Sequence, residues 1–284
     1  MRALLAAACA CACLALAGCQ SPAGSGRASL PAPDAPVPGT PRGLAADLAR
    51  TTLRLRSEIE RWTANGDPSH GGPRRAVTLL ALHQQNIYRL LTARPSEARQ
   101  VLAALPRSVV YEARDTLAAR RALAAIPATP GAPTPRIRVG AAEPAGRLRA
   151  HYLEAQRRFG IDWSLLAAVN FVESAFGRLR NASSGGAQGP MQFVPATWNA
   201  YGLGGDIHDP HDAILGAANY LRTSGAPRHV ERALFAYNRS SAYVHAILRF
   251  AHRMRADERT FYAYYAWQVY VAGPHGPVRV TGPR

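Results

Sequence analysis

The sequence predicts a mainly α-helical protein built from two helical blocks. Apolar residues recur at three- and four-residue spacings over most of the chain, which is the period of a helix with one buried face. Prolines and capping acids mark helix starts, and two proline-rich breaks divide the chain. We therefore expect a signal peptide (1–19), a flexible linker (20–43), a separate small helical region (44–126), a proline-rich linker (127–144), a second helical domain (145–273) and a tail (274–284).

The first nineteen residues predict export from the cytoplasm. Met1 and Arg2 precede an uncharged, alanine-rich run that ends at Gly18, which is typical of a secretory signal and short for a membrane span. The run closes on Leu16-Ala17-Gly18-Cys19, which resembles a bacterial lipobox, so we expect lipidation at Cys19 and an extracytoplasmic, membrane-anchored protein. The alternative is an ordinary cleaved signal. The other cysteines precede Cys19, which leaves the mature chain without a disulfide.

The chain is strongly basic but shows no basic patch. It has 34 Lys and Arg against 18 Asp and Glu, a net charge of +16, and every one of those cations is arginine. The arginines are spread along the sequence, which argues against a nucleic-acid-binding module and favours diffuse attraction to an anionic surface or polymer.

The elements of the first block follow from periodicity and breaks. Residues 20–43 are rich in Pro, Ala, Gly and Ser and have no apolar period, which indicates a tether. One amphipathic helix is then marked by Leu48, Leu55, Ile59 and Trp62. A second, after the break at Asn65-Gly66-Asp67-Pro68, is marked by Val77, Leu80, Ile87 and Leu91. Pro95 and Pro106 are expected to open two more helices, because proline suits the first helical turn.

The second block has clearer helix starts. Asp162 suits an N-cap, and Asp209 followed by Pro210 suits a cap with proline at the first helical position. Pro195 predicts a short helix that stops at Gly202. Two further helices are expected over 228–237 and 241–254. The aromatic run 261–270 is either a covering strand or loop over the core or a platform on which sugars stack.

Glu173 is the candidate for chemistry. It follows the buried stripe Leu165, Val169, Val172 and Phe176 around one helix, so it lies at the margin of that stripe. A carboxyl group desolvated in this way keeps its proton to higher pH, as a general acid needs at neutral pH. The loop from Ser174 to Gln192 contains no Asp or Glu, so no second carboxylate lies nearby in sequence.

Three short motifs occur in order around this residue. They are Glu173-Ser174, Gly189-Pro190-Met191-Gln192 and Ala236-Tyr237-Asn238. Each is weak alone, but the ordered set within a helical domain resembles the soluble lytic transglycosylases, in particular their actinobacterial lipoprotein branch. The resemblance covers residues 147–270 and implies a lysozyme-like helical fold with peptidoglycan as substrate; we expect no cofactor.

The resemblance also implies roles for individual residues. Glu173 would protonate the bond between N-acetylmuramic acid and N-acetylglucosamine and then, as a base, help close a 1,6-anhydro ring. Ser183 would hydrogen-bond that acid, and Ser174 would orient the backbone. Met191, Gln192, Tyr237 and Asn238 would bind substrate. The family pattern has Leu where this chain has Pro190, a change that removes one backbone N–H.

Several alternatives stay open at this stage. Ordinary glycoside hydrolysis uses two carboxyl groups, so a muramidase on the same fold is one rival. A non-catalytic wall-binding lipoprotein, with 44–126 as its working part, is another. The cluster Asp206, His208, Asp209, His211 and Asp212 resembles a metal site, but helix capping already accounts for Asp209 and Asp212, so we expect no metal.

Overall fold

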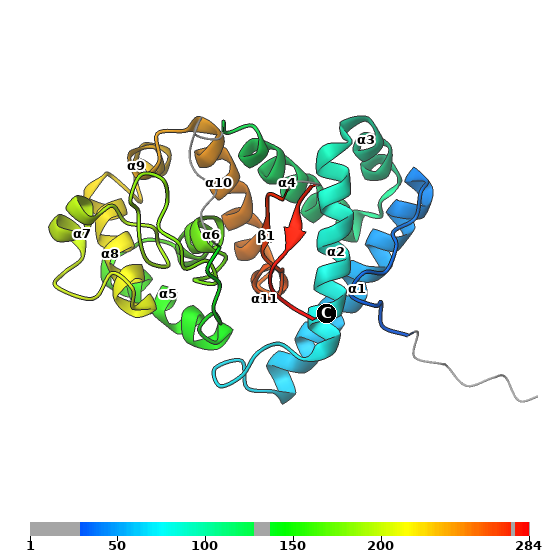
Figure 1. The fold of residues 1–284 in the computed structure, drawn as a ribbon, viewed down its shortest axis with the longest axis horizontal. Coiled ribbons are helices and arrows are strands. Elements are labelled where there is room, and N and C mark those ends of the chain that lie inside the picture. The colour runs from blue at the N-terminus through cyan, green and yellow to red at the C-terminus, as the bar shows by residue number, and fades with distance from the viewer. Residues whose placement is uncertain (1–28, 128–136, 274–275, 284) are drawn as a thin grey trace, which may run out of the picture.

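The computed structural model describes residues 29–127, 137–273 and 276–283. Within these ranges the chain forms eleven helices and one two-stranded antiparallel sheet, which confirms the mainly α fold (Figure 1). The expected signal peptide and the lipobox at Cys19 lie outside the described residues. None of the described helices is both long and apolar enough to cross a membrane.

The first four helices follow the predicted stripes and breaks. They are α1 (Pro41–Asn65), α2 (Arg75–Ala93), α3 (Pro95–Ala104) and α4 (Arg107–Ala124). The two predicted stripes are buried, with exposures of 2% or less. Helix α1 begins slightly before the expected boundary at 44, because the Thr40 hydroxyl accepts a hydrogen bond from the Gly43 N–H and Pro41 suits the first turn.

The second block contains most of the remaining helices. They are α5 (Ala145–Phe159), α6 (Trp163–Ser174), α7 (Pro195–Tyr201), α8 (Pro210–Thr223), α9 (Val230–Tyr237) and α10 (Ser241–Ala256). The predicted caps are confirmed, since the Asp162 and Asp209 carboxylates accept from the N–H groups of Ser164 and Asp212. Local capping chemistry therefore sets these starts.

The aromatic run near the C-terminus covers the core as expected, but its first half is a helix rather than a strand or loop. It forms α11 (Arg259–Tyr265), followed by β1 (Tyr270–Val271), which pairs with β2 (Val278–Arg279). Phe261, Tyr264 and Trp267 are at most 2% exposed, so their faces are not available to stack on a sugar. The Tyr264 ring instead stacks on Phe171 of α6 with centroids 5.3 Å apart. Tertiary packing has overridden the weak helix propensity of aromatic residues.

The two helical blocks are not separate, which corrects the expected organisation. One continuous core runs through both, and α4 packs along α10 between the outer helices (Figure 1). Polar contacts cross the same junction: the Thr116 and Tyr264 hydroxyls lie 2.7 Å apart, and the Gln85 amide bonds the backbone of Gln268 in both directions at 2.8 Å. The N-terminal helices therefore pack on the block that carries Glu173.

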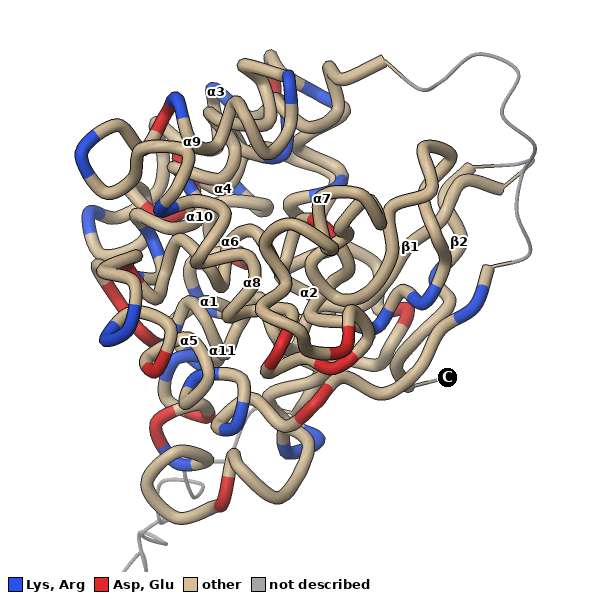
Figure 2. Tube along the Cα trace, turned by 90° about the vertical axis from the view of Figure 1, so that its left-hand side faces the viewer, with Lys and Arg blue, Asp and Glu red and all other residues tan. Residues whose placement is uncertain are grey.

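The positive charge is spread around the described trace rather than gathered on one face (Figure 2). Many arginines have acidic partners. Arg56 contacts Glu112 at 2.6 Å, Arg249 contacts Asp115 at 2.6 Å, and Arg259 contacts Asp257 at 2.8 Å. The first pair joins α1 to α4, the second joins α10 to α4, and the third lies between the end of α10 and α11.

Candidate active site

The chain reverses sharply where α6 ends. Ala175 and Phe176 both have left-handed backbone angles, with φ of 51° and 63°, before Gly177 at 79°. Such values are uncommon outside glycine and persist only where the surroundings enforce them. Here the Ser174 hydroxyl holds the backbone in these angles, because it accepts a hydrogen bond from the Gly177 N–H at 2.8 Å and donates one to the Pro190 carbonyl at 2.5 Å. Ser174 thus joins the end of α6 to the loop before α7.

The Glu173 carboxyl group lies at this helix end and is partly exposed. Burial raises its pKa from 4.5 to about 7, although a hydrogen bond from the Tyr243 hydroxyl, 2.6 Å from Oε1, acts in the opposite direction. Within the described residues, no charged side chain is among the groups that shift this pKa. The group is therefore partly protonated at neutral pH, and no carboxylate or cation of the described ranges pairs with it.

Tyr243 is a site residue that the sequence interpretation missed. It lies in the first turn of α10, where the Ser240 cap bonds its backbone N–H, and its side chain is 2% exposed. The signal was present, since Tyr243 falls on the 4-3-4 stripe Tyr243, Ile247, Phe250 and Met254. A buried tyrosine hydroxyl needs a polar partner, and that partner is Glu173.

Met191 and Tyr237 form a structural support beside the site. The Tyr237 hydroxyl donates to the Met191 carbonyl at 2.6 Å. The Met191 side chain is fully buried, so it packs in the core and does not reach a ligand, contrary to the expectation that it lines the substrate site. Burial raises the pKa of Tyr237, and the nearby Glu173 carboxyl adds to that effect. This tyrosine therefore stays neutral and fixes the loop before α7.

Gln192 lies in the same loop in a left-handed conformation, with φ of 51°. Its side-chain amide donates to the carbonyls of Gly189 and Asn181, at 3.0 and 3.4 Å. Gly189 has φ of 73°, and a Cβ there would meet the Ile207 carbonyl oxygen at 1.9 Å, so only glycine fits. The loop is thus held in one shape while Gln192 remains partly exposed.

Two of the residues predicted to bind substrate, Ser183 and Asn238, are exposed on the surface. Ser183 is exposed, and its hydroxyl accepts from the Ala187 N–H at 3.0 Å. Tyr243, not Ser183, is the side chain that bonds Glu173 among the described residues, so the expected Ser183 contact was wrong. Asn238 is also exposed, at the end of α9, where it is free to meet a ligand.

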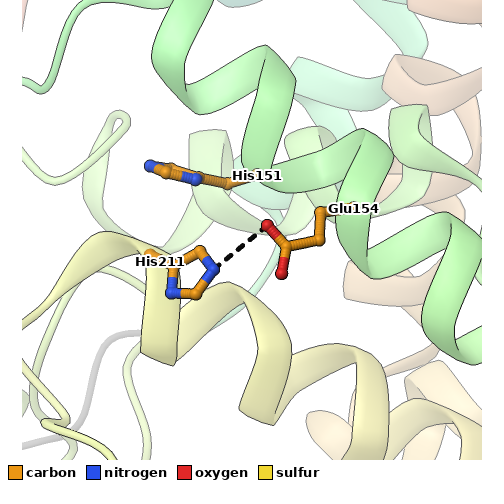
Figure 3. A group of neighbouring side chains, drawn as sticks. All are labelled: His151, Glu154 and His211. Carbon is orange, nitrogen blue, oxygen red and sulfur yellow. Dashed lines mark hydrogen bonds and ion pairs between the residues drawn. The ribbon is translucent and has the colours of Figure 1, made fainter.

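A group of possible metal ligands lies on α5 and α8, where His151, Glu154 and His211 face one another (Figure 3). His211 is engaged at both nitrogens, with Nε2 3.1 Å from Glu154 and Nδ1 3.2 Å from Asp212. Burial alone would lower its pKa, but these two carboxylates raise it. A protonated imidazole has no lone pair for a metal, so this geometry favours an ion pair.

Comparison with known families agrees with this geometry. The model described as Transglycosylase SLT domain matches residues 151–254. The matched segment contains α6, the loop before α7, and the part of α10 that carries Tyr243. Residues 151–254 are a transglycosylase SLT domain. The four N-terminal helices and α11 lie outside the matched SLT segment.

One curated relative supports the same assignment. The chain is 32% identical over 122 residues to a protein named membrane-bound lytic murein transglycosylase F from Thiobacillus denitrificans. That alignment covers 40% of this chain and only 26% of the relative. No solved structure matches the chain significantly. The SLT assignment does not select a branch, so the actinobacterial lipoprotein branch stays a prediction.

Proposed function

We propose that this protein is a peptidoglycan lytic transglycosylase that cleaves between N-acetylmuramic acid and N-acetylglucosamine and leaves 1,6-anhydro ends. The observation that carries the proposal is Glu173, a carboxyl group at the end of α6 with a pKa raised to about 7 and with no charged partner in the part of the chain that the structure describes. A single group that is half protonated near neutral pH can both give and take a proton.

Both steps use Glu173 alone. Its carboxyl group donates a proton to the glycosidic oxygen, the bond from that oxygen to C1 of the muramoyl sugar breaks, and positive charge develops at C1. The carboxylate then removes the proton from the C6 hydroxyl of the same sugar, whose oxygen closes on C1. The proton returns to Glu173, and no water is consumed. Two-carboxylate hydrolysis would instead need a second acid beside the bond.

The neighbouring residues position this acid. The Tyr243 hydroxyl donates to Oε1 at 2.6 Å, so the proton to be transferred resides on the other oxygen. Ser174 and Tyr237 hold the loop, through Pro190 and the Met191 carbonyl, against the end of α6. Gln192 is partly exposed and Asn238 is exposed, and these are the residues that we assign to contact an N-acetyl group.

Product analysis tests the proposal. Digestion of purified sacculi should release muropeptides lighter by one water than their reducing counterparts, as measured by mass spectrometry. Reducing products would identify a muramidase, and binding without release of fragments would identify a wall-binding protein. Either result contradicts the transglycosylase assignment.

We also propose that the enzyme is anchored outside the cytoplasm by a lipid on Cys19. The support is the Leu16-Ala17-Gly18-Cys19 lipobox and a relative whose name includes "membrane-bound". Cys19→Ser should move the protein from the membrane fraction to the soluble fraction. Unchanged fractionation and no labelling of the wild type by a fatty-acid probe would refute the anchor.

A further inference from the structure

A cavity of about 330 Å³ lies where the N-terminal helices meet the SLT domain. Helices α2 and α4 supply Gln85, Arg89 and Arg120 to its lining, and the segment after α11 supplies Trp267 and Tyr270. The end of α6 completes the wall with Phe171, Val172 and Ala175. Val172 and Ala175 flank Glu173 and Ser174 in the sequence, so the helix end that carries the proposed acid also forms one wall of the cavity.

The cavity contains two cations without anions. Arg120 is partly buried, and its Nε donates to the Thr92 hydroxyl at 3.1 Å. Burial and, to a smaller extent, the adjacent positive charge of Arg89 together lower its pKa to about 10. Among the described residues, no carboxylate lies within ion-pair distance of either guanidinium group. Arg56 and Arg253, by contrast, each contact an acid, Glu112 and Asp115 respectively.

The two guanidinium groups are held in place by aromatic rings. Arg89 lies over the Tyr270 ring at 3.5 Å from its centroid, and Arg120 lies over Trp267 at 5.5 Å. Hydrogen bonds hold the segment that carries those rings. The Tyr270 hydroxyl donates to Asn86 at 2.7 Å, and the Gln85 side-chain amide bonds the backbone N–H and carbonyl of Gln268, the residue after Trp267. A cation ordered before binding loses little entropy when a ligand arrives.

We propose that this cavity binds a carboxylate of the peptide stem attached to the muramoyl sugar, with Arg89 and Arg120 as the cationic contacts. This rests on the proposed function. Once the stem is attached by an amide, the glycan backbone has no free carboxylate of its own, whereas the stem ends in one. A planar guanidinium matches a carboxylate in two parallel hydrogen bonds. The apolar walls at Phe171 and Val172 suit the methyl groups of alanine-rich stems.

The proposed stem-binding cavity uses residues outside the matched SLT segment as well as residues within it. Arg89 and Arg120 lie on α2 and α4, outside residues 151–254. The N-terminal helices therefore contribute a specificity contact, in addition to packing on α10.

Direct binding tests the site without turnover. Glu173→Gln protein is titrated with a soluble stem tetrapeptide, with the same peptide fully amidated, and with inorganic phosphate. We expect the free peptide to bind, the amidated peptide to bind at least tenfold more weakly, and Arg89→Gln or Arg120→Gln to weaken binding by about tenfold. The exposed Arg99→Gln on α3 is the matched control and should bind as its parent does. Equal affinity for the amidated peptide, or for phosphate, contradicts the proposal.

A second measurement separates this site from the proposed activity. In Arg89→Gln, the kcat/KM ratio for peptide-bearing over peptide-stripped glycan strands should fall by about tenfold relative to wild type. An unchanged ratio in an active enzyme overturns the stem site alone. A wild type that cuts neither substrate overturns the proposed function. In that case the peptide titration still tests whether the cavity binds a stem carboxylate. Thermal unfolding checks each variant, and Arg89→Gln decides the matter if Arg120→Gln loses stability with its Thr92 contact.

Discussion

Glu112 and Glu173 are both desolvated carboxyl groups, but their surroundings differ. Glu112 on α4 is 5% exposed, and burial raises its pKa, while Arg56 at 2.6 Å and the Gln84 amide at 3.2 Å oppose that shift. Among the described residues, the one side chain that hydrogen-bonds the Glu173 carboxyl group is the neutral Tyr243 hydroxyl. The cation at Glu112 stabilises a fixed charge that joins helices. Its absence at Glu173 leaves a proton that can be moved, which is the property that catalysis needs.

The largest expected effect is on turnover. Glu173→Gln keeps the shape of the side chain but removes the transferable proton, so turnover of sacculi should fall by at least about 1,000-fold. Glu231→Gln, an exposed acid in the first turn of α9, is the control and should retain wild-type turnover. Residual activity within tenfold of wild type in Glu173→Gln would assign the chemistry to another group.

Removing the Arg56 partner of Glu112 should instead lower the stability of the fold. Arg56→Met leaves a buried carboxylate without its cation and should reduce the free energy of unfolding by about 3 kcal/mol, measured in urea. Arg50→Met removes the exposed partner of Asp47 on the same helix and should cost less than about 1 kcal/mol. Equal losses in the two variants would show that burial does not distinguish these pairs.

Glu173 should also make stability depend on pH. Its folded pKa of about 7 exceeds the model-peptide value of 4.5, so its contribution to stability is fully present below about pH 4.5 and is lost as the pH rises through 7. Glu173→Gln does not titrate. Its stability relative to wild type should therefore increase by about 3 kcal/mol between pH 4 and pH 8. Parallel stability curves for the two proteins would mean that the Glu173 pKa is not raised.

The smallest expected effect is at Tyr243. Tyr243→Phe removes the hydrogen bond that lowers the Glu173 pKa, so that pKa should rise. Since the acid must start protonated, the alkaline limb of the kcat/KM profile should move to higher pH, while kcat falls by about tenfold through loss of orientation. A lower kcat with an unmoved alkaline limb would indicate a merely structural role.

The sequence predicted the features that depend on local chemistry. The caps at Asp162 and Asp209 and the proline-initiated starts at Pro95 and Pro195 are where capping rules put them. The position of Glu173 at the margin of a buried stripe was predicted in the same way, because helical periodicity fixes which face a residue lies on.

Features that depend on distant contacts were not predicted. The Tyr243 contact joins residues 70 positions apart, and nothing local specifies it. Met191 was expected to bind substrate, but its side chain fills the core while only its carbonyl serves the site. The two blocks were expected to be separate because a proline-rich break divides them, yet α4 and α10 share one apolar interface. A break in composition shows where the chain is irregular, not where the core ends.

The most direct test of a solitary acid is the origin of the oxygen at each new chain end. Sacculi are digested in water enriched in ¹⁸O, and the released muropeptides are analysed by mass spectrometry. Because the proposed mechanism closes the ring with the sugar's own C6 oxygen, we predict anhydro ends that contain no ¹⁸O. Reducing ends that each carry one ¹⁸O would show that water is the nucleophile and would contradict the account.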